Sequence, residues 1–128
     1  MDPIANMLTS VMNAQRVGKK RVMVPFSSFK KDLLEFMQAK NMIGSVRVQE
    51  GPIQKLIVSL SYDENAKPVL NGASRLSKPG TRYYAAATDI PYKYQGVGTV
   101  IISTSKGLMD EKQARKAGLG GELICVIW

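Results

Sequence analysis

The sequence predicts an α+β protein made of two small units, and three observations lead to this prediction. The first 40 residues contain two stretches with apolar side chains at helical spacing. Stretches that alternate apolar and polar residues follow them, as in half-buried strands. After Ser77 the chain changes to short strands and turns with one short helix. We therefore expect two helices on a three-stranded sheet over residues 1–70, and a mainly-β unit over residues 71–128.

The first helix is expected to begin at Pro3, because proline lacks the N–H that a first helical residue leaves unpaired. Asp2 can cap the free backbone donors at this end. Gly18 ends the helix, and a short strand is expected over residues 21–24. The side chains expected on the buried face of the helix are Ile4, Met7, Leu8 and Val11.

A second helix is expected to run from a cap at Ser27 or Ser28 to about Lys40. Two strands should follow, joined by a turn at Gly51-Pro52. The side chains expected to face the core are Phe29, Leu33, Phe36 and Met37 of the helix, and Val46, Val48, Leu56, Val58 and Leu60 of the strands.

The boundary between the two units is expected near a polar stretch over residues 63–68, which ends in Pro68. This composition predicts either a linker or a long turn. Residues 69–76 are compatible with a strand that either closes the first unit or crosses to the second.

The second unit is expected to consist of short strands and turns around one short helix. Asp110 can cap this helix, and Gln113 lies three residues on, where its side chain can cap in return. The expected elements are a turn at 78–80, strands over 82–85, over 99–103 and up to Trp128, and a helix through Lys116.

The net charge of +8, from 18 Lys and Arg against 10 Asp and Glu, favours a polyanionic partner. Ten basic and six acidic residues precede a cut after Leu70, and eight basic and four acidic residues follow it, so each part carries +4. A polyanion should therefore contact both parts. On charge alone, a basic protein without a nucleic-acid partner is equally compatible.

Residues for catalysis or metal binding are scarce. The absence of histidine excludes histidine acid–base chemistry and histidine metal ligands. Cys125 lies in an apolar run, so we expect a buried thiol rather than a nucleophile, and a single cysteine is compatible with a reducing compartment. Residues 95–98 lack the third glycine of a phosphate-binding loop and are interpreted as a turn. We expect no catalytic residue, cofactor or metal.

Targeting and membrane segments are not expected either. The start Met1-Asp2-Pro3 lacks the basic and apolar regions of a signal peptide. No run of about 18 apolar residues occurs, so the chain is not expected to span a membrane.

Three consecutive hydroxyl residues, Ser103, Thr104 and Ser105, make the most distinctive motif. Their short side chains donate and accept hydrogen bonds and can approach ribose, phosphate and base edges. Lys106 adds a charge for phosphate, and Gly107 permits a tight backbone. A rigid loop of this kind suits shape-specific RNA recognition. The alternative is a solvated turn whose hydroxyls bond their own backbone.

A second group of candidate residues lies in the strand over 82–85. Alternation places Arg82 and Tyr84 on one face and Tyr83 on the other. A tyrosine beside an arginine can stack on an unpaired base. Alternatively, one tyrosine belongs to the core and the other lies at its rim. Tyr92 and Tyr94 offer a weaker version of the same arrangement, with loop packing as the alternative.

Several stretches, taken together in order and spacing over the full length, resemble the family of small-subunit ribosomal protein eight of bacteria and organelles. The matching stretches are Asp2-Pro3-Ile4-Ala5, Met7-Leu8-Thr9, Ser77-Lys78-Pro79-Gly80, Arg82, Tyr84, Gly98, Ser103-Thr104-Ser105-Lys106-Gly107, Ala114-Arg115 and Gly118-Leu119-Gly120-Gly121-Glu122.

The resemblance implies a non-enzymatic constituent of the small ribosomal subunit whose two α+β units clamp a helix of central-domain rRNA and assist assembly. In the family, the Ser-Thr-Ser loop reads an irregular part of that helix with hydroxyl groups. Tyr84 and Glu122 would support this loop or touch the RNA. Carried over to this chain, the rRNA-binding residues would be Ser103, Thr104, Ser105, Lys106, Gly107, Tyr84, Glu122, Arg82, Lys78, Asp2, Pro3, Thr9, Ser27 and Lys30.

The resemblance also implies neighbouring small-subunit proteins as partners and a ribosome in the cytoplasm, with plastid and mitochondrial ribosomes as alternatives. Many bacterial members bind messenger RNA of their own operon, so a translational repressor is the alternative function. An enzyme with a carboxylate or lysine site is a third, disfavoured class.

This chain departs from the family at three positions that are usually basic. Ser10, Met12 and Ser28 stand there, and Asn6 replaces a usual acidic residue. Fewer cations in the first unit should flatten the salt dependence of RNA binding. Met12 is expected to pack either on a ribosomal neighbour or in an enlarged core face.

Overall fold

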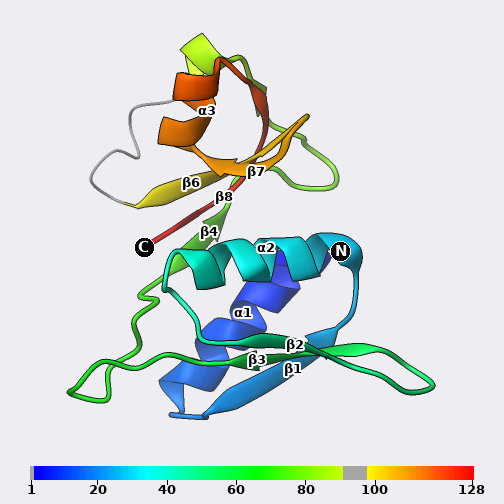
Figure 1. Cartoon of the computed structure of the whole chain (residues 1–128), viewed down its shortest axis with the longest axis vertical. Helices are drawn as coiled ribbons and strands as arrows, with labels where there is room; N and C mark the ends of the chain where they lie inside the picture. Colours follow the sequence, from blue (N-terminus) through cyan, green and yellow to red (C-terminus); the bar gives the residue numbers. More distant parts are fainter. Residues whose placement is uncertain (1, 91–97) are drawn as a thin grey trace. The chain divides into compact units, whose positions relative to one another are not determined.

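The computed structural model describes residues 2–90 and 98–128. The chain divides into an N-terminal unit, Pro3–Asn71, and a C-terminal unit, Gly72–Trp128, to which Asp2 also belongs. Both units combine helix with antiparallel sheet, so the predicted α+β class is confirmed (Figure 1).

The two helices of the N-terminal unit are α1 (Pro3–Arg16) and α2 (Ser28–Ala39). Helix α1 buries the predicted apolar face, and Gly18 follows it with a φ of +76°, the left-handed conformation common after helix ends. Ser27 caps α2, since its hydroxyl oxygen accepts the backbone N–H of Lys30. Leu33, Leu34 and Met37 are buried in α2, whereas the predicted core residues Phe29 and Phe36 are half-buried.

Three antiparallel strands form the sheet of this unit: β1 (Arg21–Pro25), β2 (Val46–Gln49) and β3 (Lys55–Ser59). Their order is β1-β3-β2, so β3 pairs on both edges. Helix α1 packs against β1, and helix α2 packs against β2 (Figure 1). The strand residues whose side chains turn to the helices are Val22, Val24, Val46, Val48, Leu56 and Val58.

Residues 63–68 form a turn within the N-terminal unit. Of the two expected alternatives, a linker or a long turn, the structure shows the turn. The Asp63 carboxylate accepts the backbone N–H groups of Asn65 and Lys67, at 2.8 and 2.9 Å. Tyr62 and Pro68 close the turn as an isolated antiparallel bridge. Side chains such as Asp63 stabilise turns by satisfying backbone donors in this way.

The C-terminal unit contains a five-stranded antiparallel sheet whose path runs β4-β8-β6-β7. Strands β4 and β5 both pair with β8, at opposite ends of it. The elements of this unit are β4 (Ala73–Arg75), β5 (Tyr84–Ala85), the 3-10 helix η1 (Ala87–Asp89), β6 (Thr99–Thr104), β7 (Gly107–Asp110), α3 (Glu111–Ala117) and β8 (Gly121–Ile127).

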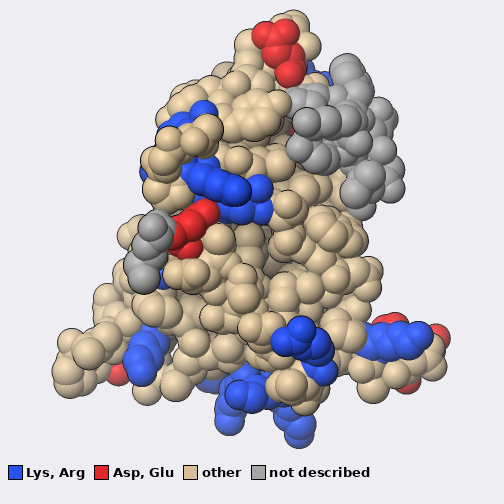
Figure 2. Space-filling model, turned by 180° about the vertical axis from the view of Figure 1, so that it is seen from behind, with Lys and Arg blue, Asp and Glu red and all other residues tan. Residues whose placement is uncertain are grey.

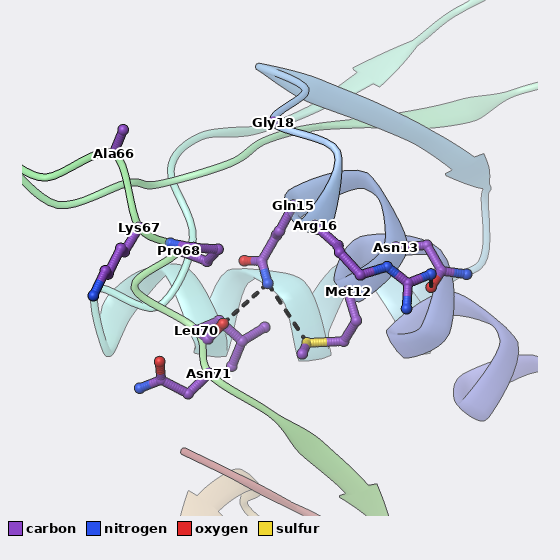
Figure 3. Close-up of a pocket in the computed structure, with 10 residues that line it drawn as sticks. All are labelled: Met12, Asn13, Gln15, Arg16, Gly18, Ala66, Lys67, Pro68, Leu70 and Asn71. Atoms are coloured by element: carbon purple, nitrogen blue, oxygen red, sulfur yellow. Dashed lines mark hydrogen bonds between the residues drawn. The ribbon is translucent and has the colours of Figure 1, made fainter.

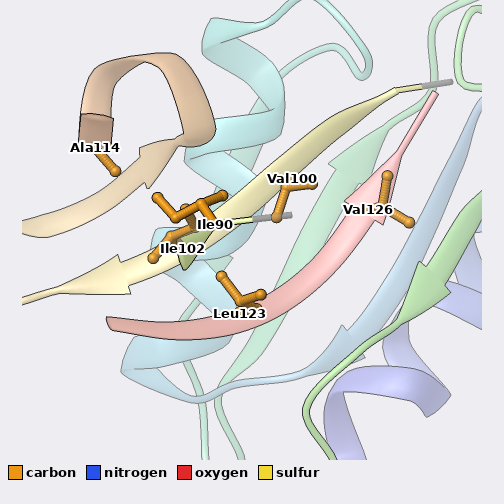
Figure 4. Packing of buried hydrophobic residues seen from close by; sticks show 6 residues of the cluster. All are labelled: Ile90, Val100, Ile102, Ala114, Leu123 and Val126. Atoms are coloured by element: carbon orange, nitrogen blue, oxygen red, sulfur yellow. The ribbon is translucent and has the colours of Figure 1, made fainter. Parts of the chain in front are cut away.

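The core of the C-terminal unit lies between the β6–β8 pair and helix α3 (Figure 4). Asp110 and Gln113 form the predicted capping box, which fixes the start of α3 directly after β7. The buried residues of this cluster are Ile90, Val100, Ile102, Ala114, Leu123 and Val126.

The second sheet differs from the prediction in two places, and part of the prediction lies outside the described residues. Strand β7 was not predicted, and it forms because Gly107–Asp110 pairs with the end of β6. Only Ala73–Arg75 of the predicted strand over 69–76 is a strand, and it pairs with β8 of the C-terminal unit, which is the second of the two expected alternatives. Tyr92, Tyr94 and residues 95–97 lie outside the described residues.

Candidate nucleic-acid interface

The three hydroxyl residues of the distinctive motif lie at the tip of the β6–β7 hairpin. Ser103 and Thr104 are the last residues of β6 and pair with Leu108 and Gly107 of β7. Only Ser105 and Lys106 form the turn, which is therefore shorter than the predicted loop. Gly107 has a φ of +105°, a conformation that glycine adopts without the penalty that a Cβ brings.

The hydroxyl groups of the hairpin have different roles. Thr104 donates its hydroxyl hydrogen to the carbonyl oxygen of Gly107 at 2.7 Å, and its oxygen accepts the backbone N–H of Lys106 at 3.2 Å. This hydroxyl satisfies the turn itself, as the alternative interpretation expected. Ser105 and Lys106, in contrast, are exposed. The hairpin thus presents a serine hydroxyl and an ammonium group on a turn that Thr104 stabilises.

Behind the turn, the strand register places Tyr84, Glu122 and Ser103 opposite one another on β5, β8 and β6. Directly opposed residues of antiparallel strands point to the same face of a sheet. These three residues, called the transverse row below, therefore share one face. Residues 84, 103 and 122 are far apart in the sequence, so only the sheet register brings them together.

Glu122 holds the transverse row to the loop before β5. Its carboxylate accepts hydrogen bonds from the hydroxyl of Ser77 and from the Arg82 guanidinium, the latter at 3.0 Å. Ser77 is fully buried, and its oxygen also accepts the backbone N–H of Tyr83 at 3.0 Å. The side chain of Glu122 is 18% exposed. Glu122 thus bonds Ser77 and Arg82 before β5, and whether it supports the hydroxyl motif or touches RNA stays a prediction.

Ser77 was absent from the predicted site residues, although it belongs to the Ser-Lys-Pro-Gly stretch of the family resemblance. Its importance follows from complete burial together with two hydrogen bonds, which a sequence pattern does not reveal. The following residues form the predicted turn, since Lys78 and Thr81 exchange backbone hydrogen bonds of 3.0 and 3.1 Å. Lys78 is exposed on this turn.

The two tyrosines of the second candidate group separate as one core and one surface residue. Tyr83 is half-buried against the core of the C-terminal unit. The side chain of Tyr84 is 67% exposed, next to Glu122 in the register. Tyr84 therefore combines an exposed ring with a fixed backbone, which is the geometry a stacking contact requires.

The close approach of β6 and β8 depends on glycine. A Cβ at Gly121 would lie 2.0 Å from the carbonyl oxygen of Ser103, and one at Gly120 would lie 2.4 Å from that of Ala85. Both neighbours are backbone atoms, which cannot rotate away. The paired glycines before Glu122 are thus required for the transverse row to form.

The predicted contact residues near the N-terminus have varied surroundings. Asp2 belongs to the C-terminal unit, where its carboxylate binds Arg75 Nε at 3.1 Å. Pro3 and Thr9 are exposed on α1, and Lys30 is half-buried in the first turn of α2. Ser27 is the cap of that helix. No described contact tests their binding to RNA, which stays a prediction.

Met12 lies at a groove of about 540 Å³ within the N-terminal unit (Figure 3). Its sulfur accepts a weak hydrogen bond from the Gln15 amide at 3.6 Å, and the same amide donates to the carbonyl oxygen of Leu70 at 3.0 Å. Met12 is half-buried and therefore packs partly within its own unit.

Cys125 is buried in β8, and this burial raises the pKa of its thiol to about 12, with a smaller opposing effect from the nearby Arg75 charge. A protonated, buried thiol is a poor nucleophile. Among residues 2–90 and 98–128, no group of three potential carboxylate or thiolate ligands could hold a metal ion. Within the same residues, each helix is too short or too polar to cross a membrane.

Comparison with known proteins finds similarity to one family. Residues 2–128 match the family model described as Ribosomal protein S8. A relative from Finegoldia magna is 44% identical, and the alignment covers 99% of this chain and 98% of the relative. Relatives from Deinococcus deserti and Cellvibrio japonicus are 41% and 42% identical, over 99% of this chain and 98% and 97% of their own. All three are named small ribosomal subunit protein uS8.

Proposed function

The chain belongs to the ribosomal protein S8 family, and on that premise we propose that it binds rRNA directly and assists assembly of the small ribosomal subunit. The family is a structural, non-enzymatic component of that subunit. Its partners would be the central domain of the rRNA and neighbouring ribosomal proteins. The ribosome in which it acts would be cytoplasmic.

The observation that supports this proposal most strongly is that the β6–β7 hairpin and the transverse row expose side chains that are mostly polar but uncharged. Ser105 and Lys106 are exposed at the tip, and Tyr84 is exposed behind it. Short hydroxyl side chains bind ribose and base edges only where the RNA brings those groups close. A surface of this kind therefore selects an irregular RNA helix by its shape.

Each exposed group would have a separate task in binding. The hydroxyl of Ser105 would exchange hydrogen bonds with a ribose or base edge, and Lys106 would approach a phosphate. The ring of Tyr84 would stack on an unpaired base or pack on a ribose. Thr104 and Glu122 would keep these groups in place, because their polar atoms bond the turn and the loop before β5.

A single-atom change at Ser105 tests the proposal. We expect Ser105→Ala to weaken binding to a defined rRNA fragment by about 1–3 kcal/mol, because its partner would lose a hydrogen bond in a dry contact. Ser74→Ala, at an exposed serine of β4, is the matched control and should bind as the wild type does. Filter binding or calorimetry at two salt concentrations would measure the difference.

Thr104→Val separates the hairpin's own stability from RNA contact. Because this hydroxyl bonds Gly107 and Lys106, its loss should lower the melting temperature as well as the affinity. Ser105→Ala should leave the melting temperature unchanged. If Ser105→Ala and Lys30→Ala instead showed equal losses of affinity that both disappeared at high salt, binding would be nonspecific and the proposal would fail.

The alternative function, repression of the protein's own messenger RNA, would use the same hairpin. A message that folds into a similar irregular helix would present the same ribose and base edges. Competition between the operon message and the rRNA fragment for the wild-type protein tests this prediction. A message that fails to displace the rRNA would exclude it.

A further inference from the structure

The three-stranded sheet of the N-terminal unit has one face that its helices do not cover. In the register, Met23 of β1 lies opposite Ile57 of β3, which lies opposite Arg47 of β2. On one side of this row, Arg21 lies opposite Ser59, and on the other side Pro25 lies opposite Lys55, which lies opposite Gln49. Ser45 lies beside Ser59, because the two hydroxyl groups form a hydrogen bond of 2.8 Å. The open sheet face therefore comprises Arg21, Met23 and Pro25, then Ser59, Ile57 and Lys55, then Ser45, Arg47 and Gln49.

The opposite face of the same strands is buried, which fixes the direction of these side chains. Val24, Leu56 and Val58 are at most 2% exposed, and strand residues alternate between faces. On the open sheet face, by contrast, Arg21, Arg47 and Lys55 are all exposed. Met23 is 53% exposed, although it is a large apolar residue.

The charge on the open sheet face has one sign. Its nine positions include three cations and no Asp or Glu. Lys19 and Lys20, which directly precede β1, are exposed as well. Figure 2 shows Lys and Arg side chains gathered along the lower border of the view, where the N-terminal unit lies. An uncompensated set of cations on a rigid sheet favours binding of a polyanion.

The cations are spread over the face. Neighbouring strands lie about 4.8 Å apart and alternate residues of one strand about 7 Å apart, so three cations in three rows can meet separate phosphates. The face carries no aromatic side chain on which a base could stack. Its chemistry therefore fits the RNA backbone and not base identity.

We infer that the open sheet face is a second RNA-binding surface, which holds the phosphate backbone of a folded RNA independently of the β6–β7 hairpin. This inference rests on the proposed rRNA binding, and it adds a second surface to the β6–β7 hairpin. None of the predicted contact residues lies on this face. Its contribution to affinity is electrostatic and falls as salt rises.

The test compares two triple variants of equal net charge. Arg21→Gln, Arg47→Gln and Lys55→Gln together neutralise the open sheet face, and Lys67→Gln, Lys112→Gln and Lys116→Gln together neutralise exposed lysines elsewhere. Affinity for intact small-subunit rRNA is measured over a series of salt concentrations. The face variant should lower the slope of log affinity against log salt by about 2–3, at about 0.7–0.9 per contact, and the control by much less.

Three outcomes separate the possible failures. Wild-type protein that does not bind rRNA would remove the proposed function itself. Wild-type binding with equal slopes for the two triple variants would overturn the inference alone. If the face variant bound naked rRNA like the control but was lost from subunits assembled with their proteins, the face would contact a protein instead, and the inference would also be wrong.

A variant that retains the charges controls for effects of the substitutions on folding. Arg21→Lys with Arg47→Lys keeps every charge of the face and should keep the wild-type salt slope. Circular dichroism melting of all variants should give similar midpoints, because the three substituted side chains are exposed.

Discussion

The β6–β7 hairpin and the open sheet face offer RNA two different kinds of chemistry. The hairpin presents a serine hydroxyl and one lysine on a turn whose backbone groups Thr104 satisfies. The open sheet face presents three cations and an exposed Met23 on a regular sheet. The first surface depends on hydrogen-bond geometry, and the second depends on charge that water and salt can screen.

This difference teaches where each kind of substitution should matter. Around the hairpin, small changes to uncharged groups should have large effects, because buried atoms such as the Ser77 hydroxyl and close backbone contacts fix the geometry. On the open sheet face, only loss of charge should matter. Under our proposals, shape specificity would therefore belong to the C-terminal unit, and general backbone affinity would belong in part to the N-terminal unit.

The largest expected effect is that of Gly121→Ala. The added Cβ would lie 2.0 Å from the carbonyl oxygen of Ser103, so β6 and β8 must separate. Overpacking against backbone should lower the free energy of unfolding by about 3 kcal/mol. Urea denaturation monitored by circular dichroism measures this free energy. Gly80→Ala is the control, because a Cβ there meets no atom within 4 Å, and it should be nearly neutral.

The next effect is expected at Glu122, where removal of the carboxylate tests its supporting role. Glu122→Ala leaves the buried Ser77 hydroxyl without its acceptor, which should lower the free energy of unfolding by about 1–3 kcal/mol. Glu122→Gln keeps an acceptor and should lose less. If both variants kept full stability but lost rRNA binding, Glu122 would contact RNA directly and the assignment as a support would be wrong.

The smallest effect is expected at Lys30, a predicted phosphate contact at the start of α2. Lys30→Ala should reduce rRNA affinity modestly and lower the salt slope by about 0.9, the share of one phosphate contact. Its backbone N–H still binds the Ser27 cap, so the stability of α2 should not change. A loss that persists at high salt would show that Lys30 reads the RNA by geometry instead.

Local patterns in the sequence correctly predicted most of the elements. Apolar spacing predicted both N-terminal helices, and the Asp110–Gln113 pair predicted the capping box of α3. Helix caps and turns depend on residues three or four apart, so a single segment contains the information. The family resemblance led to the hydroxyl motif, which the structure places on an exposed hairpin tip.

Strand β7 escaped prediction because the four residues of Gly107–Asp110 carry too weak a pattern by themselves. Pairing with β6 makes them a strand, and the pairing depends on a turn of only two residues. For the same reason, the sequence left open whether the Thr104 hydroxyl would contact RNA or bond its own backbone. Its hydroxyl lies toward the turn only once the hairpin has closed.

The sequence by itself determined the α+β class, the positions of the helices, the positive charge and the hydroxyl motif, because each depends on composition or on neighbours along the chain. Only the tertiary structure decided that Tyr84, Glu122 and Ser103 share a face and that Arg21, Arg47 and Lys55 lie together on another sheet. Strand register decides such neighbours. It follows from the packing of the whole core and from glycines that allow close approach, which no single segment encodes.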